Sequence, residues 1–274
     1  MAENSWNGYL TKMETENVGS EYDVVPKYFL SLNGVRLEMN QFIGKHVSVE
    51  YAGQIKCIKC GRITKKSFGQ GYCYPCFISV PETEECVLRP ELCKAQLGIA
   101  RDMGYATNHC LIDHFVYLAW SGGVKVGVTR FHQVPTRWID QGATHAVKLC
   151  RTKNRYSAGL VEVELKKIMS DKTPWQAMLK GVEDENLNLL FEKDKALEYI
   201  NGKSLEYIPE TNGLYRITYP VNEYPVKVKS HSFDKESVFS GILMGIKGQY
   251  LILESGTVLN IRKHSGYIVT VKVE

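Results

Sequence analysis

Two pairs of cysteines constrain this chain more than any other feature of its sequence. Each pair has the spacing Cys-x-x-Cys, and twelve residues separate Cys57 and Cys60 from Cys73 and Cys76. Four thiolates at this spacing are typical of a tetrahedral zinc site, whose binding energy contributes to folding. Unliganded thiols or a redox dithiol are the alternatives, and the glycine- and lysine-rich loop between the pairs favours zinc. Four protein ligands leave no position for a substrate, so we expect a structural zinc.

The loop between the two pairs resembles the hairpin of a zinc ribbon or of a treble-clef knuckle. It spans residues 61–72 and carries glycines at both ends, Gly61 and Gly71, where the chain has to turn.

The composition is that of a soluble globular protein, with 44% hydrophobic and 23% charged residues in a chain of 274. No apolar run approaches the roughly 20 residues needed to span a bilayer. The first residues lack a basic segment followed by an apolar one. We therefore expect a cytoplasmic protein whose eight cysteines are reduced.

Positive charge is concentrated in one part of the chain. Residues 125–180 hold eleven Lys or Arg against four Asp or Glu, although the whole chain has a net charge of only +4. Such an excess is typical of a phosphate-binding surface, and a solvated basic face or mobile loop is the alternative. The candidate nucleic-acid contacts are Arg130, Lys148, Arg151, Lys153 and Arg155.

Strand, helix and turn signals divide the chain into four predicted units. Residues 1–56 form a small N-terminal β element, and residues 57–112 form the zinc knuckle and an irregular connector with brief helical turns. Residues 113–204 form a central α/β domain. Residues 205–274, with short apolar runs between glycine turns, form a small SH3-like or OB-like barrel. The expected fold class is α+β.

The central unit has the most definite element pattern. Residues 115–120 and 124–129 have strand character on either side of a Ser-Gly-Gly turn, which predicts a hairpin. Pro135 suits the first turn of a helix, and Ser157 the cap of a second one. A break at Thr173 and Pro174 precedes more helix, which extends to about residue 200.

This order of elements resembles the GIY-YIG nuclease superfamily, and the residues can be matched individually. Phe115-Val-Tyr117 stands where that family has Gly-Ile-Tyr, and Lys125-Val-Gly127 stands where it has Tyr-Ile-Gly. Arg137 occupies the position of the family's helical arginine, and Glu164 that of its metal-binding glutamate. Two positions depart from the pattern: Lys125 replaces the second tyrosine, and Gln141 stands where several members have a catalytic histidine.

The resemblance implies metal-assisted hydrolysis of a DNA or RNA phosphodiester. Tyr117 would help to deprotonate water, Glu164 would hold one Mg²⁺ or Mn²⁺, and Arg137 would neutralise the scissile phosphate. The structural alternative is a buried Glu164–Arg137 salt bridge without catalysis, with Tyr117 as core packing.

Helix geometry predicts which of two carboxylates faces inward. Glu162 lies four residues before Lys166, as in an ordinary surface ion pair. Glu164 would share its face with Leu160, Val161 and Ile168, so we expect its carboxylate on the core side.

Over nearly its whole length the sequence resembles an uncharacterised bacterial family, domain of unknown function 2797. The matching segments are Cys57-x-x-Cys60, Cys73-x-x-Cys76, Arg89-Pro-Glu-Leu-Cys93, Phe115-Val-Tyr-Leu, Lys125-Val-Gly-Val-Thr-Arg130, Pro135-Thr-Arg-Trp-Ile-Asp-Gln-Gly-Ala143 and Ser170-Asp-Lys-Thr-Pro-Trp175. This resemblance supports the order of the units and implies no established activity.

A second metal site is an open alternative in the connector. Its ligands would come from Cys86, Cys93, Cys110 and His114, whose spacing is not diagnostic, and buried unliganded cysteines are the alternative.

The sequence supports three functional hypotheses. The first is a divergent GIY-YIG nuclease with a structural zinc module. The second is a zinc-containing nucleic-acid-binding or ribonucleoprotein module that does not cleave, and the third is a protein-interaction scaffold. Salt-sensitive binding that is indifferent to Mg²⁺ would indicate the second.

Overall fold

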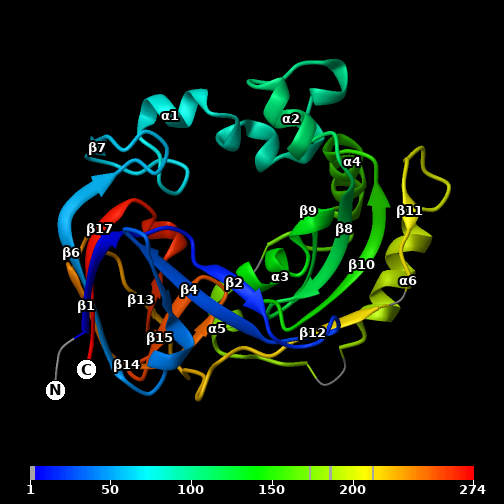
Figure 1. Cartoon of the computed structure of the whole chain (residues 1–274). Coiled ribbons are helices and arrows are strands. Elements are labelled where there is room, and N and C mark those ends of the chain that lie inside the picture. The colour runs from blue at the N-terminus through cyan, green and yellow to red at the C-terminus, as the bar shows by residue number, and fades with distance from the viewer. Residues whose placement is uncertain (1–3, 173, 185–186, 212) are drawn as a thin grey trace.

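The computed structural model describes residues 4–172, 174–184, 187–211 and 213–274. It contains an eight-stranded, a six-stranded and a three-stranded sheet together with short helices, which confirms the mixed α+β class. The two large sheets stand side by side in Figure 1, and the cysteine-rich connector runs above them from one to the other. Both ends of the chain lie at the same edge of the eight-stranded sheet.

The eight-stranded sheet interleaves strands from the two ends of the sequence. Next to its edge lies β17 (Tyr267–Val273), paired antiparallel on one side with β1 (Asn4–Tyr9) and on the other with β6 (His46–Lys56). The remaining strands are β14 (Val238–Lys247), β15 (Tyr250–Leu253), β16 (Thr257–Asn260), β13 (Lys229–Ser230) and β7 (Ile63–Thr64).

This arrangement corrects the barrel expected over residues 205–274. Among the described residues the sheet is open, with β1 and β13 at the ends of its strand order. The C-terminal strands complete a sheet that residues 4–56 begin, because β6 pairs with both β14 and β17. Periodicity marks strands without identifying their partners, which explains the difference.

The six-stranded sheet contains the predicted hairpin, now β8 (His114–Trp120) and β9 (Val124–Arg130). Strand β10 (His145–Thr152) pairs antiparallel with β8, so β8 is central between β9 and β10. The rest of the sheet is β12 (Leu214–Ile217), β3 (Asp23–Val24) and β11 (Ile208–Pro209). Both ends of the chain therefore contribute to this sheet as well.

Helices cover both faces of the six-stranded sheet. The helix α3 (Thr136–Asp140) forms after Pro135, as predicted, and its Trp138 packs edge-on against Tyr117 with 5.9 Å between ring centroids. On the other face lie α4 (Arg155–Leu165) and α6 (Leu189–Ile200), whose apolar residues pack on Val116 and Leu118.

Two helix boundaries differ from the sequence prediction. Asn154 caps α4, with its Oδ1 accepting the Ser157 N–H at 2.8 Å, so the cap lies three residues before the one expected at Ser157. After Pro174 the chain forms a short α5 (Trp175–Leu179) and then α6, with a break between them. Thr173, part of the predicted break, lies outside the described residues.

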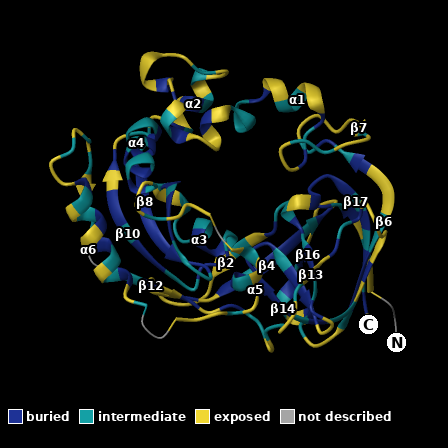
Figure 2. Ribbon diagram, turned by 180° about the vertical axis from the view of Figure 1, so that it is seen from behind, coloured by how far each residue is buried: buried dark blue, intermediate teal, exposed yellow. Residues whose placement is uncertain are grey.

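One apolar core joins the two large sheets. Tyr117 and Trp138 belong to the same buried cluster as Tyr28 and Phe239, which come from the N-terminal and C-terminal segments. Figure 2 shows the buried residues concentrated on the strands, while the connector at the periphery is largely intermediate or exposed. The central unit and the flanking β segments therefore share a core.

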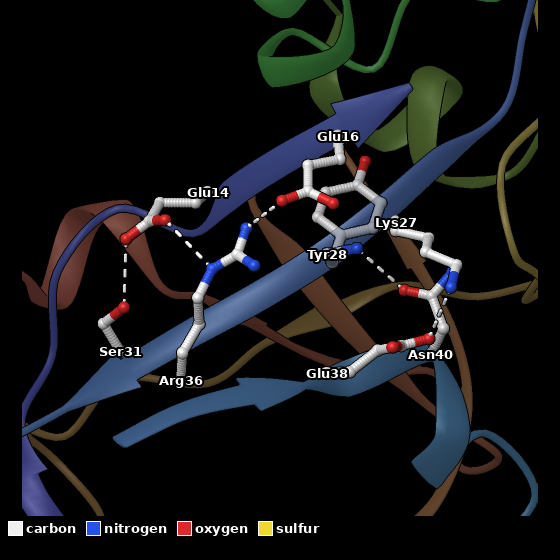
Figure 3. Close-up of polar contacts among 8 residues, drawn as sticks. All are labelled: Glu14, Glu16, Lys27, Tyr28, Ser31, Arg36, Glu38 and Asn40. Atoms are coloured by element: carbon white, nitrogen blue, oxygen red, sulfur yellow. Dashed lines mark hydrogen bonds and ion pairs between the residues drawn. The ribbon is translucent and has the colours of Figure 1, made fainter. Parts of the chain in front are cut away.

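The small sheet is stabilised on its surface by polar pairs. It consists of β2 (Glu14–Asn17), β4 (Pro26–Leu32) and β5 (Val35–Glu38). Arg36 bridges Glu14 and Glu16 at 3.3 and 2.6 Å, and Figure 3 shows this fork across the strands. The Asn40 side chain accepts the Tyr28 N–H at 2.8 Å and so ties η1 (Met39–Phe42) to β4.

The connector is irregular, as predicted, with short helical turns. These are α1 (Tyr74–Ser79), η2 (Pro81–Thr83), η3 (Glu85–Val87), η4 (Pro90–Leu92), η5 (Ala95–Leu97) and α2 (Met103–His109). Elsewhere η6 (Phe131–Gln133) follows β9, and η7 (Arg262–His264) links β16 to β17. No helix in the described parts of the chain is long and apolar enough to cross a membrane.

Candidate functional site: a four-cysteine centre and an arginine-lined pocket

The four cysteines of the two Cys-x-x-Cys pairs come together, as the sequence predicts. Cys57 follows β6, and Cys60 lies in the turn after it. Cys73 is the N-cap of α1, and Cys76 lies in its first turn. The segment between the pairs folds back through a bridge between Phe68 and Tyr72. A knuckle followed by a hairpin and a helix therefore presents all four sulfurs to one point.

The distances between the sulfurs fit a tetrahedral metal. All four Sγ atoms lie within 4.8 Å of one another, and Cys60 and Cys73 are 3.8 Å apart. Four sulfurs at about 2.3 Å from zinc in a tetrahedron are separated by about 3.8 Å. Burial alone would raise the pKa of Cys57, but backbone N–H groups of Cys60 and Cys73 outweigh it and lower the pKa to about 6. Such a thiol is readily available as a thiolate ligand.

The second feature is a pocket lined by basic side chains from four parts of the chain. Its volume is about 260 Å³. The cations that line it are Lys12, Arg130, Arg137, Arg155 and Arg262. Asp140 is the only acid among its described lining residues, and it forms an ion pair with Lys12 and accepts a hydrogen bond from Gln249 at 3.0 Å. The charge of Asp140 is therefore already balanced, and the four guanidinium groups leave a positive excess.

Two of the pocket arginines are partly removed from water. Burial lowers the pKa of Arg262, and the neighbouring Arg137 lowers it further. Burial also lowers the pKa of Arg130, with an added contribution from Arg155. Like charges in a desolvated site oppose one another unless an anion joins them.

Two lining side chains carry buried polar atoms without a partner in the described protein. They are Nε of Arg155 and Nε2 of His114, and each side chain is at least nine-tenths buried. The other ring nitrogen of His114 contacts the Ile112 carbonyl at 2.8 Å. Burial lowers the pKa of His114 to about 4, so this ring adds no charge to the pocket near neutral pH. The unmatched Arg155 donor is a further indication of an anionic ligand.

Tyr117, Arg137 and Gln141 lie close together in the structure. The Tyr117 hydroxyl donates to Oε1 of Gln141 at 3.0 Å, and burial raises its pKa although nearby Arg137 and Gln141 lower it. The side chain of Tyr117 is fully buried. In this conformation its hydroxyl is a packed hydrogen-bonding group without contact to solvent.

Lys125 lies on the same sheet as Tyr117, opposite Ala119. It is 5% exposed, and burial together with the Arg137 charge lowers its pKa to about 8. Asp171 and Glu162 act in the opposite direction. Lys125 is thus a buried amine whose pKa lies closer to neutrality than that of an ordinary lysine.

The orientation predicted for the two helical carboxylates is reversed in the structure. Glu164 forms ion pairs with Lys167 at 2.6 Å and with Lys203 at 3.2 Å. Glu162 does pair with Lys166 at 3.5 Å, but it is 8% exposed, and burial raises its pKa. Its charge, in contrast to that of Glu164, reaches Tyr117 and Lys125.

The physical reason is the angular position of each glutamate on α4, which places Glu162 on the buried stripe and Glu164 beside it. The helix stops at Leu165, so Ile168 is not on its apolar stripe and is 49% exposed. The buried stripe runs through Ala158, Val161, Glu162 and Leu165.

The predicted basic contacts are divided between two surfaces. Arg130 and Arg155 line the pocket, together with Arg137. Lys148 instead lies over the rings of Phe115 and Tyr215, at 4.9 and 5.4 Å from their centroids.

The other two basic residues also lie outside the pocket. Arg151 pairs with Asp113 and Glu210 at 3.3 and 3.6 Å, and Lys153 is exposed.

Sequence reasoning missed Lys12 and Arg262 as pocket residues. No local signal marks them, since Arg262 lies in a turn of the C-terminal sheet, 125 positions after Arg137. Lys12 and Arg262 reach the same pocket as Arg137 only because the two large sheets pack against each other.

Comparison with known proteins assigns the chain to a family. A sequence profile described as protein of unknown function (DUF2797) matches residues 44–269, which is most of the chain. The chain belongs to the DUF2797 family. The match spans the cysteine centre, the connector, the hairpin and η7, so all the pocket cations except Lys12 lie within the family region. Searches of curated proteins and of solved structures found no match to this DUF2797 chain.

Proposed function

We propose that this DUF2797 protein binds nucleic acid through its phosphate backbone, with the arginine-lined pocket as a phosphate site and the four-cysteine centre as a structural zinc. The convergence of Arg130, Arg137, Arg155 and Arg262 on one pocket is the observation that carries the proposal. Guanidinium groups match phosphate because their planar forks donate two parallel hydrogen bonds to it.

The chemistry of the pocket favours phosphate over a carboxylate metabolite. Four guanidinium groups exceed what one carboxylate would balance, whereas consecutive phosphates of a strand supply repeated negative charge. The surrounding segment has the excess of basic residues that a polyanion requires. DNA and RNA share this backbone, so the pocket alone does not distinguish them.

The zinc has a positioning role in this proposal. Cys57 directly follows β6, the strand that also pairs with β17. The turn η7, which carries Arg262, lies between β16 and β17. When bound, zinc would hold the knuckle at the end of the same sheet that presents Arg262. No described residue outside the four cysteines is needed to complete the coordination.

Metal-dependent hydrolysis is the second candidate, and one observation favours it. The hairpin of β8 and β9 is followed by α3, whose Arg137 lies beside Tyr117, and this arrangement supports the candidate. The carboxylates do not fit a Mg²⁺ or Mn²⁺ site in this structure, because Glu164 is held by two lysines and Asp140 by Lys12. Binding without cleavage is therefore the function the geometry supports best.

A retention assay tests the proposal directly. Labelled single- and double-stranded DNA and RNA are titrated with wild type, Arg137→Gln and Arg151→Gln. Arg151 is the matched control, since it lies outside the pocket and pairs with Asp113 and Glu210. Losing a charge-assisted hydrogen bond costs about 1.5–3 kcal/mol, so Arg137→Gln is expected to weaken binding about tenfold or more. Equal affinity of Arg137→Gln and wild type would contradict the pocket assignment.

The same substrates separate binding from cleavage. Incubation with Mg²⁺ or Mn²⁺, and with chelator, is compared for wild type, Glu164→Ala and Glu162→Gln. The proposal predicts intact substrate in every arm and binding that does not depend on added Mg²⁺. Cleavage that requires the metal and disappears in either glutamate variant would establish the nuclease instead.

A further inference from the structure

The connector contains a second cluster of three cysteines, separate from the four-cysteine centre. Cys86 lies in η3, Cys93 is the C-cap of η4, and Cys110 is the C-cap of α2. Their Sγ atoms lie within 4.8 Å of one another. All three side chains are buried, at 3–6% exposure. Three separate short turns therefore direct thiols to one enclosed point.

The connector has only a small apolar core of its own around these sulfurs, although η4 also packs against α4. This core consists of the three cysteines with Ala95 and Ala106, and the partly buried hydrophobic residues packed against it in the described parts of the chain are Ala100, Met103 and Tyr156. Residues 80–110 contain four 3₁₀ turns and one seven-residue helix, with no strand among them. Two alanines and partly buried neighbours provide a very small apolar core. A metal crosslink is the usual means by which such a segment keeps a fixed conformation.

Arg155 supplies the charge that a three-thiolate site needs. Its guanidinium donates to the carbonyls of Cys86 and His109, both at 3.2 Å, and its backbone N–H donates to the Cys110 carbonyl at 2.8 Å. A divalent metal with three thiolates has a net charge of −1. The buried guanidinium next to them offsets this charge and lowers the cost of burying such a site, while Arg130, Arg137 and Arg262 keep the positive excess of the pocket.

We propose that Cys86, Cys93 and Cys110 form a second zinc site, with three thiolate ligands and a fourth position open to a non-protein ligand. Among the described residues, no other His, Cys, Asp or Glu ligand atom joins the group. His114, which the sequence offered as a fourth ligand, is therefore outside it. An open position distinguishes this site from the closed four-cysteine centre, because a water or a small thiol can occupy it.

Metal content tests this proposal on the full-length chain purified with zinc. Wild type is expected to hold two zinc ions per chain, Cys93→Ser one and Cys73→Ser one. Cys150 is a buried cysteine of β10 outside both clusters, so Cys150→Ser is the matched control and should keep two. One zinc per wild-type chain would overturn the proposal, as would two in Cys93→Ser. The wild-type count decides the matter even if Cys93→Ser fails to fold.

Cobalt substitution and chelator competition separate the two sites. In wild type loaded with Co²⁺, added mercaptoethanol should change the visible spectrum of one of the two ions, because only the three-thiolate site has an exchangeable position. Both spectra remaining unchanged would contradict the open coordination. Arg155→Gln removes the compensating charge, so one zinc should be released to chelator at about tenfold lower chelator concentration while the other is unaffected. Identical release of zinc from Arg155→Gln and wild type would show that the Arg155 charge does not stabilise the three-thiolate site.

Discussion

The Tyr117 ring lies across Gly127, its partner on the neighbouring strand of the hairpin. A Cβ placed on Gly127 would be 2.5 Å from the Tyr117 hydroxyl oxygen and 2.7 Å from Cζ. The glycine is required because it leaves the sheet surface open at this point. The tyrosine can therefore lie flat and reach Gln141 from the strand.

Gly127→Ala is expected to displace the Tyr117 ring and to destabilise the fold by about 1–3 kcal/mol, the usual cost of overpacking a core. Urea unfolding measures this change in the free energy of unfolding. Gly123→Ala in the same hairpin is the control, since its Cβ would first meet Pro174 at 3.8 Å. Equal stability of the two variants would show that Tyr117 does not occupy this place.

Tyr219→Phe tests what holds the helix of Arg137 in position. The Tyr219 hydroxyl lies 2.9 Å from the Ala143 carbonyl and within 3.4 Å of the Trp138 carbonyl, all in the core. Its loss leaves a buried carbonyl unsatisfied, which costs about 1–3 kcal/mol. Thermal unfolding should show the loss. Tyr74→Phe changes a tyrosine that is 56% exposed and should leave the midpoint unchanged.

Lys125 should make stability depend on pH above neutrality. Its folded pKa is lowered to about 8, from an ordinary value near 10.5. Between these two pH values the unfolded chain binds more protons than the folded one, so the free energy of unfolding rises with pH. The full effect is on the order of 3 kcal/mol, since one pKa unit corresponds to about 1.4 kcal/mol.

Lys125→Met removes this contribution. Urea unfolding at pH 7 and at pH 10 should therefore show a smaller increase for the variant than for wild type. Lys247, whose pKa is also lowered to about 8, titrates in the same range and is unchanged in both proteins. An identical increase in the free energy of unfolding in the two proteins would contradict a lowered pKa for the buried Lys125 amine.

Removing zinc from the four-cysteine centre should unfold the knuckle while the sheets stay folded. Binding at a structural zinc site contributes about 10 kcal/mol or more to local folding. Chelation, or Cys60→Ser, should therefore expose residues 57–80 to limited proteolysis, with Cys150→Ser as the control. Protection of this segment after complete metal loss would show that the knuckle is stable without zinc.

Local sequence signals predicted the elements whose partners are close in the chain. The hairpin of β8 and β9 needs only alternating residues and a Ser-Gly-Gly turn, and α3 needs only Pro135 at its start. The four-cysteine centre could be predicted because spacing alone brings its ligands together. In each case the residues that interact lie within about twenty positions of one another in the sequence.

Long-range partners could not be predicted in the same way. Pairing of Asn4 with Val273 carries no sequence signal, and it replaces an expected barrel by a sheet shared between both ends of the chain. Arg262 reaches the pocket through that sheet. The reversed orientations of Glu162 and Glu164 have a local cause, since the buried stripe of α4 runs through Val161, Glu162 and Leu165.

Arg262 provides the most direct test of the phosphate pocket, because only the fold connects it to Arg137. The measurement is the affinity of wild type, Arg262→Gln and Arg151→Gln for one labelled nucleic acid over a range of salt concentrations. A phosphate contact predicts weaker binding for Arg262→Gln and a salt slope reduced by about one, with Arg151→Gln close to wild type. An unchanged affinity and slope for Arg262→Gln would contradict the pocket as the nucleic-acid site.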